Sequence, residues 1–218
     1  MSKKFIAAVV GTANTGKTTF KNDLIESFSS DPKFEPFTTN EVDYREKILK
    51  EGLKINREGN LRSQKIIFDC LADSLIQAVK DPSVTNFISD RSVIDAYVYT
   101  VYLMEHNPDS GITEKDLVAM RSSMVAFSKM YDRIIYFPLS ECSDIEVVDD
   151  KFRDTDYWFR LQIDRIFNNT LTFLEGIGAC HSVRDITGSR EERVSKFREI
   201  FGGLWLSTKD EDNGGERT

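Results

Sequence analysis

The stretch AAVVGTANTGKTTFKND, Ala7–Asp23, decides the fold of this chain. Six small or apolar residues, Phe5–Val10, run directly into a segment that holds two glycines, a lysine and two neighbouring threonines. A short apolar run without polar alternation is typical of a strand that is buried on both faces of a parallel sheet. The residues that follow, Lys17–Phe28, fit a helix. We therefore predict a buried strand, a glycine-rich turn and a helix in direct succession.

The turn matches the phosphate-binding motif G-x-x-x-x-G-K-[ST] in full, from Gly11 to Thr18. Glycines let the backbone wrap so that successive N–H groups point at phosphate oxygens, and the following helix adds its positive N-terminal end. In such a loop Lys17 reaches the β- and γ-phosphates, and the Thr18 hydroxyl ligates Mg²⁺. A strand–helix turn without a ligand is the alternative, but the flanking strand and helix favour a nucleotide site. The predicted nucleotide contacts are Gly11, Thr12, Ala13, Asn14, Thr15, Gly16, Lys17, Thr18 and Thr19.

The rest of the chain alternates short apolar runs with longer periodic ones, which predicts an α/β fold with a doubly wound parallel sheet flanked by helices. We expect one domain over residues 1–206 and a disordered tail over residues 207–218, because the sequence STKDEDNGGERT is polar and glycine-rich. Further strands are predicted at Phe87–Ser89, Ile134–Phe137 and Cys180–Ile186, with an edge strand near Phe34–Thr39, which contains Pro36. Further helices are predicted at Leu61–Val79, Val93–Glu105, Thr113 to about Met130, Asp156–Leu174 and Glu191–Phe201.

Composition limits the classes of function. The 218 residues carry a net charge of −7, which disfavours a passive basic nucleic-acid coat but leaves room for a local basic groove. Three widely spaced cysteines and two histidines make a zinc site or a disulfide framework improbable and suit a reducing cytosol. No apolar run approaches the roughly 18 residues of a membrane span. We therefore expect a cytoplasmic protein without a membrane anchor.

A second motif ends a later predicted strand. In the segment NFISDRSVIDAYVY, a short apolar run stops at Asp90, Arg91 and Ser92 and turns into a helix. The carboxyl ends of strands in such sheets face the ligand crevice. Asp90 could therefore act on Mg²⁺, directly or through water, or accept a proton from an acceptor hydroxyl, while Arg91 could hold phosphate oxygens. A helix-capping Asp with an exposed Arg is the alternative.

With these two motifs, the sequence resembles the P-loop nucleoside and nucleotide kinases. The segment VVDDKFRDTDYWFRLQID, Val147–Asp164, is similar to the acidic and arginine-containing segment of a branch that includes ribosylnicotinamide kinases and phage-encoded kinase-like ATP-binding proteins. The resemblance extends from Phe5 to about Phe201. It implies a P-loop NTPase fold with a helical lid that brings arginines over the phosphates, where phosphoryl transfer needs cations. It nominates Arg153, and with less weight Arg160 and Arg165; pairing at i,i+4 on a solvated helix is the alternative.

The resemblance also implies where the acceptor binds, between the second strand and the helices after it. It makes Asp43 and Glu41 candidates for the catalytic base. It makes Gln64 a candidate for hydrogen bonding, through its amide, to the edge of a nucleobase. Polar side chains that simply face solvent would explain all three at least as well. In kinases of this fold, the loop after the last strand backs the adenine ring, which here nominates Gly188 and Ser189; Ser189 also suits a helix N-cap.

These observations together predict an ATP- and Mg²⁺-dependent kinase that transfers the γ-phosphoryl group to a hydroxyl of a nucleoside-like acceptor. Phage kinases of broadly similar type act on 5-hydroxymethyluracil in DNA, so both free nucleosides or nucleotides and hydroxymethylated DNA remain candidate acceptors. A regulatory ATP-binding switch with little turnover is the rival hypothesis. A motor-type ATPase fits less well. The predicted strand Phe87–Ser89 ends in the sequence NFISDRS, whereas a motor-type ATPase usually has four apolar residues followed by Asp-Glu.

Overall fold

A five-stranded sheet forms the centre of the computed structural model, which describes residues 4–142, 154–184 and 186–213. All four strand pairings are parallel, so the structure confirms the doubly wound α/β fold. The strand that carries the glycine loop lies in the middle of the sheet, and the strand predicted as an edge is an edge. The strand order is β2 (Phe37–Thr38), β3 (Asn86–Asp90), β1 (Phe5–Val10), β4 (Arg133–Tyr136) and β5 (Ser182–Val183).

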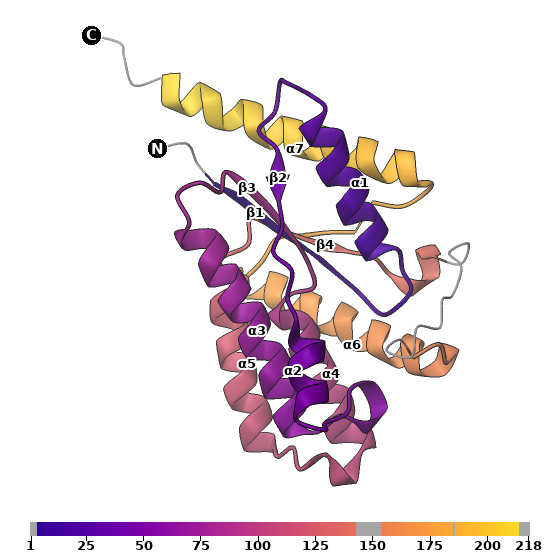
Figure 1. Ribbon diagram of the computed structural model, residues 1–218. Helices are drawn as coiled ribbons and strands as arrows, with labels where there is room; N and C mark the ends of the chain where they lie inside the picture. Colours follow the sequence, from indigo (N-terminus) through magenta and orange to yellow (C-terminus); the bar gives the residue numbers. More distant parts are fainter. Residues whose placement is uncertain (1–3, 143–153, 185, 214–218) are drawn as a thin grey trace.

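Helices cover both faces of the sheet (Figure 1). One face carries α1 (Lys17–Ser29) and α7 (Arg190–Asn213), and the other carries α3 (Leu61–Lys80), α4 (Val93–His106) and α6 (Tyr157–Gly176). On that second side, α5 (Glu114–Ser128) packs on α4, and the short α2 (Tyr44–Lys50) packs on α3. Single 3₁₀ turns occupy Asn56–Glu58, Pro108–Ser110 and Leu139–Cys142.

The central strand β1 is buried on both faces, which explains why its sequence shows no polar alternation. Ala7 and Val9 point into the core beneath α1 and α7, whereas Ile6, Ala8 and Val10 point into the core beneath the other helices. Successive side chains of a strand alternate between faces, so a strand covered on both sides must be apolar throughout. This arrangement fixes the end of β1, and with it the start of the glycine loop, in a rigid environment.

The first residues of α4 and α5 are held by reciprocal capping hydrogen bonds. Thr113 accepts a hydrogen bond from the Asp116 backbone, and the Asp116 carboxylate accepts one from the Thr113 backbone, which confirms the helix start predicted at Thr113. Ser92 and Asp95 form the same arrangement at the start of α4. Each cap satisfies backbone N–H groups that have no partner within the helix.

Two features differ from the sequence-based expectation. Helix α7 continues to Asn213, so the boundary predicted at Ser207 falls inside a helix; no proline interrupts the segment, and its Lys, Asp and Glu residues tolerate helical geometry. Residues 214–218 lie outside the described residues. Helix α2 was not predicted, because its seven residues bury only Tyr44 and Ile48 and are too few for a periodic pattern.

Among the helices described here, none is long and apolar enough to span a membrane.

Candidate functional site

The glycines of the loop are required by its geometry. Gly11 has a φ of +138°, and a Cβ atom there would lie 2.7 Å from the carbonyl oxygen of Phe137. Gly16 is the N-cap of α1 in the left-handed conformation, with a φ of 80°. Asn14 also has a positive φ, of 56°. The backbone therefore bends tightly between β1 and α1, as a phosphate-binding loop requires.

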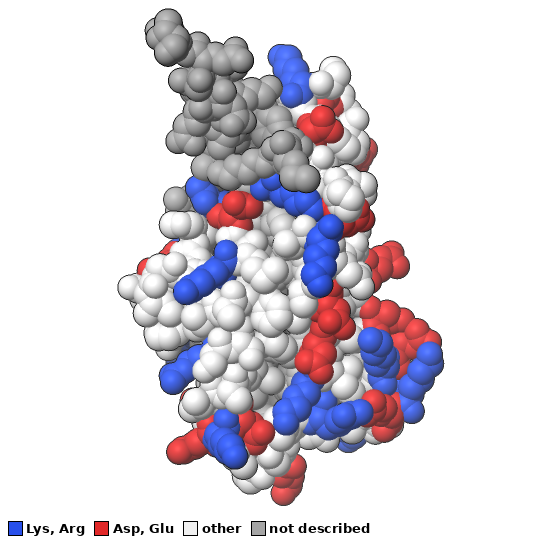
Figure 2. Space-filling view, turned by 90° about the vertical axis from the view of Figure 1, so that its left-hand side faces the viewer, with Lys and Arg blue, Asp and Glu red and all other residues white. Residues whose placement is uncertain are grey.

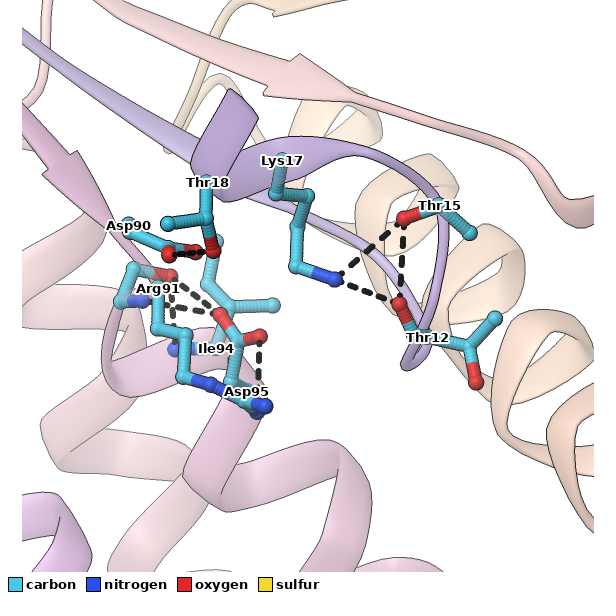
Figure 3. Close-up of polar contacts among 9 residues, drawn as sticks. Thr12, Thr15, Lys17, Thr18, Asp90, Arg91, Ile94 and Asp95 are labelled. Carbon is cyan, nitrogen blue, oxygen red and sulfur yellow. Dashed lines mark hydrogen bonds and ion pairs between the residues drawn. The ribbon is translucent and has the colours of Figure 1, made fainter. Parts of the chain in front are cut away.

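Lys17 points back into the concave side of this loop (Figure 3). Its side chain is buried, and its ammonium donates hydrogen bonds to the Thr12 carbonyl and, at 3.3 Å, to Thr15 Oγ1. Thr15 Oγ1 in turn donates to the Thr12 carbonyl at 3.1 Å. The position is the one from which an ammonium reaches the outer phosphates of a bound nucleotide.

Thr18 and Asp90 meet across the gap between α1 and β3. The Thr18 hydroxyl donates a hydrogen bond to Asp90 Oδ2, and Asp90 lies opposite Val9 in the pairing of β3 with β1 (Figure 3). Hydroxyl and carboxylate oxygens are ligands that Mg²⁺ prefers, and Mg²⁺ usually keeps several waters besides one or two protein groups. The pair therefore fits a Mg²⁺ ion shared with phosphates. Elsewhere in the described ranges, no group of three or more His, Cys, Asp or Glu side chains could hold a metal ion.

Arg91 lies beside a buried carboxylate. Its own φ is 95°, its backbone N–H donates to the Val9 carbonyl at 3.0 Å, and its Nη1 lies 3.8 Å from Asp95 Oδ1. Asp95 is 1 % exposed and accepts a hydrogen bond from the Ser92 backbone at 2.8 Å. Burial raises the pKa of Asp95 to about 6, although the charges of Arg91 and Lys17 act in the opposite direction. A positive φ in a non-glycine residue is costly and is concentrated at functional sites.

A cavity beside the first turn of α3 contains a polar side chain without a hydrogen-bond partner. Gln64, on the first turn of α3, is 1 % exposed, and neither its amide oxygen nor its amide nitrogen has a hydrogen-bond partner in the structure. Asp95 Oδ1 also lacks a hydrogen bond, although it faces the Arg91 guanidinium. Buried polar groups are nearly always paired, so orphaned ones indicate a missing ligand or water. The cavity is lined by Tyr44, Arg45, Ile55, Asn56, Gln64, Ile67, Arg91, Asp95, Ala96 and Tyr99.

This cavity meets the glycine loop at two arginines. Arg45 and Arg91 line the cavity around Gln64. They also line a second cavity, which is formed by the glycine loop, Thr18 and Asp90. A nucleotide on the loop and a ligand beside Gln64 would therefore face one another across these guanidinium groups. Most of the predicted loop residues line the second cavity: Ala13, Asn14, Thr15, Gly16, Lys17, Thr18 and Thr19.

Two of the predicted acceptor residues lie outside both cavities. Asp43 is the N-cap of α2 and accepts a hydrogen bond from the Glu46 backbone at 3.0 Å; its hydrogen bonds with Glu46 lower the pKa of Asp43. Glu41 is exposed. Neither residue lines either cavity, so their roles as a base stay predictions.

The predicted lid arginines have different surroundings. Arg160 is buried on α6, and it donates to the loop carbonyls of Ala13 at 3.0 Å and Asn14 at 3.2 Å. Arg165 is exposed. Arg153 lies outside the described residues, so its predicted contact with the γ-phosphate stays a prediction.

The loop after β5 begins α7 with a cap. Gly188 has a φ of +99°, and Ser189 Oγ accepts a hydrogen bond from the Glu192 backbone at 3.2 Å. The Ser189 backbone donates to the Glu192 carboxylate at 2.7 Å. The cap expected for Ser189 is therefore present, and the contact of this loop with adenine stays a prediction.

Sequence reasoning missed Arg45, Asp95 and Arg193. Asp95 follows Ser92 at the spacing of a capping box, a signal that could have nominated it as a buried group. Arg45 and Arg193 carry no local signal, because their surroundings depend on which elements pack together. Arg193 on α7 donates to the Thr15 carbonyl at 3.3 Å and lies over the Phe137 ring at 4.8 Å.

Comparisons with known proteins agree with this geometry. No family model matches the sequence, and no curated protein matches it. Solved structures do match: thymidylate kinase from Candida albicans is 15% identical, with a TM-score of 0.67 over 93% of this chain and 92% of that one. Deoxyadenosine kinase from M. mycoides, with bound dATP, is 13% identical, with a TM-score of 0.60 over 89% of this chain and 98% of that one.

A third similar structure is the NadR protein in complex with NAD and AMP-PNP, which is 16% identical with a TM-score of 0.61. The match covers 91% of this chain and 50% of NadR, so the chain spans about half of that protein. At these identities the likeness concerns the fold. Together with the complete glycine-loop motif between β1 and α1, it shows that this chain has the α/β P-loop fold found in nucleoside and nucleotide kinases.

Proposed function

We propose that this protein is an ATP- and Mg²⁺-dependent kinase that transfers the γ-phosphoryl group to a hydroxyl of a nucleoside-like acceptor. One observation carries the proposal: the cavity of the phosphate-binding loop and the cavity around Gln64 meet at Arg45 and Arg91. A phosphoryl group can pass directly between two bound substrates only where their sites adjoin.

The residues at this junction supply the charges that the reaction needs. Lys17 would neutralise the β- and γ-phosphates, and Thr18 and Asp90 would hold Mg²⁺, which would add positive charge beside the phosphates. Arg45 and Arg91 would face the transferred group from the acceptor side. Phosphoryl transfer spreads negative charge over the γ-oxygens, so cations on several sides stabilise the transition state. Arg153 is proposed to add a further cation from the lid.

The side chains around Gln64 would suit a flat ring with a polar edge, and the cavity of about 30 Å³ would have to widen to admit it. Gln64 offers one donor and one acceptor from the same amide, which matches the paired groups on the edge of a base. Tyr44 and Tyr99 contribute aromatic walls to the cavity. The thymidylate and deoxyadenosine kinases with the same fold support a nucleoside or nucleotide as the acceptor.

Hydroxymethylated DNA of a phage is the alternative acceptor. Gln64 is buried, so a base in a duplex would have to be extruded to reach it, at a cost of a few kcal/mol. On the face drawn in Figure 2, the Lys and Arg side chains of the described residues are interspersed with Asp and Glu around a broad uncharged area. That face lies on the side of the sheet where β1 begins, away from the glycine loop (Figure 1), so it is the burial of Gln64 that disfavours duplex DNA.

A regulatory ATP-binding switch is the rival from another class. A switch needs the nucleotide loop but has no need of an adjoining cavity that contains the unpaired amide of Gln64. The orphaned Gln64 therefore favours the kinase.

The test is a transfer assay with γ-labelled ATP and Mg²⁺ against a panel of nucleosides, nucleotides and hydroxymethylated DNA. We expect the label on one class of acceptor, with free nucleosides or nucleotides ahead of DNA. A matched assay with Arg153→Ala should lower kcat strongly and change ADP affinity little, because a lid cation acts mainly in the transition state. A switch would lose ATP affinity and label no acceptor.

A further inference from the structure

Two buried arginines donate hydrogen bonds to backbone carbonyls of the phosphate-binding loop, next to the Thr12 carbonyl that accepts from Lys17. Arg160 is 5 % exposed and Arg193 is 7 % exposed. Arg160 comes from α6, and its Nε and Nη2 atoms donate to the carbonyls of Ala13 and Asn14 at 3.0 and 3.2 Å. Arg193 comes from α7, and its Nη1 donates to the Thr15 carbonyl at 3.3 Å. Three consecutive carbonyls of the loop are thus held by helices on opposite faces of the sheet.

The planarity of the peptide group gives these contacts a consequence for the N–H groups. In a trans peptide, the carbonyl of one residue and the N–H of the next point in opposite directions. Fixing the Ala13 and Asn14 carbonyls outward therefore directs the N–H groups of Asn14 and Thr15 to the other side. Fixing the Thr15 carbonyl does the same for the N–H of Gly16. These three groups are successive donors of the kind that cradle phosphate oxygens.

We propose that Arg160 and Arg193 are positioning residues: they hold the carbonyls of residues 13–15 outward so that the N–H groups of Asn14, Thr15 and Gly16 face the phosphates of a bound nucleotide. The inference rests on the proposed nucleotide site but not on the identity of the acceptor. It assigns Arg160 a role different from the phosphate contact that the sequence predicted for a lid arginine.

The chemistry of the guanidinium group suits this role. A planar fork with donors in fixed directions can bridge two adjacent carbonyls, which the single ammonium of a lysine does less well. Arg193 is itself fixed, because its Nε donates to the Gly188 carbonyl at 3.0 Å and its guanidinium lies over the Phe137 ring. Through Arg193, the loop before α7 and the phosphate-binding loop are held in one arrangement. Both charges would also add to the positive potential at a phosphate bound in the loop.

The experiment measures binding alone, so it needs no acceptor and no turnover. The probes are ADP and inorganic tripolyphosphate with Mg²⁺, titrated calorimetrically into the parent, Arg160→Gln, Arg160→Lys and Arg193→Lys. We expect Arg160→Gln to weaken both probes by about tenfold or more and the lysine variants to weaken them less, because charge-assisted hydrogen bonds are lost in part. Equal losses for the two probes would assign the effect to the phosphates, since tripolyphosphate carries no adenine.

Arg198→Gln is the matched control, because Arg198 lies on α7 but donates to the Ser27 carbonyl at 3.2 Å and lies over the Phe28 ring at 5.0 Å. It should lower the melting temperature and leave both affinities unchanged. Unchanged affinity in a folded Arg160 or Arg193 variant would overturn the inference, and a parent that binds neither probe would overturn the proposed function as well. If the Arg160 variants do not fold, amide NMR of the parent decides: tripolyphosphate must shift the N–H signals of Asn14, Thr15 and Gly16, and unshifted signals would refute the role.

Discussion

Lys17 is held by acceptors that a triphosphate would replace. The Thr12 carbonyl and the Thr15 hydroxyl accept its hydrogen bonds, and phosphate oxygens are stronger acceptors because they are charged. Lys17→Ala should therefore keep the fold and lower the rate of transfer by roughly 10²–10³, about 2.7–4 kcal/mol of transition-state stabilisation. Steady-state rates beside circular dichroism would measure this. Lys50→Ala, at a position where the side chain is 71% exposed, is the control. Activity equal to the parent's would refute the assignment of the loop.

Gln64 should show opposite effects on stability and on activity. Gln64→Met keeps the shape of the side chain but removes two buried atoms that have no partner, so the free energy of unfolding should rise, by about 1 kcal/mol. The same change leaves the polar edge of the acceptor unpaired and should lower kcat/KM for the acceptor by roughly 5–150-fold, about 1–3 kcal/mol. ATP affinity should stay constant. Urea unfolding measures the expected rise in the free energy of unfolding, and acceptor kinetics measure the expected fall in kcat/KM. A destabilised variant with normal kinetics would make Gln64 a core residue only.

Asp95 should make stability depend on pH in an unusual direction. Its pKa of about 6 lies above the ordinary value of 3.8, so between these values the folded protein binds a proton that the unfolded chain has lost. The contribution of Asp95 to stability is therefore full below about pH 4 and is lost as the pH rises to about 6, at up to ~1.4 kcal/mol per pH unit.

The test of this sign compares the parent with Asp95→Asn in urea unfolding at pH 4, 5, 6 and 7. Other carboxylates titrate in both proteins, so the difference between the two isolates Asp95. The free energy of unfolding of the parent minus that of the variant should fall by about 2–2.5 kcal/mol from pH 4 to pH 7. A constant difference would mean that Arg91 keeps Asp95 ionised throughout.

At the scale of elements, α7 closes the core over α1. Phe197 is fully buried, and its ring centroid lies 6.0 Å from that of Phe20, 6.2 Å from that of Phe28 and 5.8 Å from that of Phe37. Phe197→Ala should therefore cost about 3–5 kcal/mol of stability. Phe173, which is 42 % exposed on α6, is the matched control and should cost far less. Equal melting temperatures for the parent and Phe197→Ala would contradict the packing of α7.

The sequence predicted long elements and local motifs well. Helix α3 begins at the predicted residue, Leu61, because an apolar stripe and an Asn60 cap act together there. The loop after β1 was predicted because its geometry depends on its own glycines. The strand predicted at Cys180–Ile186 is longer than the observed β5, because the two residues Ser182–Val183 are too few to show a pattern. The surroundings of Arg45, Arg160 and Arg193 could not be predicted, because each depends on helices that meet the loop only after folding.

At the scale of the whole molecule, the sheet brings distant segments to one place. The ends of β1 and β3 lie side by side, which puts the phosphate-binding loop next to Asp90 and Arg91. The segment from Arg45 to Gln64 then forms the opposite wall. Substrates on the two sides would meet at Arg45 and Arg91, an arrangement that would allow the direct transfer proposed above.

The most direct measurement is the destination of the γ-phosphoryl group. Purified protein, γ-labelled ATP, Mg²⁺ and the preferred acceptor of the panel are mixed, and the label is divided between the acceptor and inorganic phosphate, with Lys17→Ala as the inactive control. The account predicts that most of the label is found on a hydroxyl of a nucleoside-like acceptor, and that omitting the acceptor nearly stops ATP consumption. Label found only in inorganic phosphate at an unchanged rate, or ATP bound without any turnover, would contradict it.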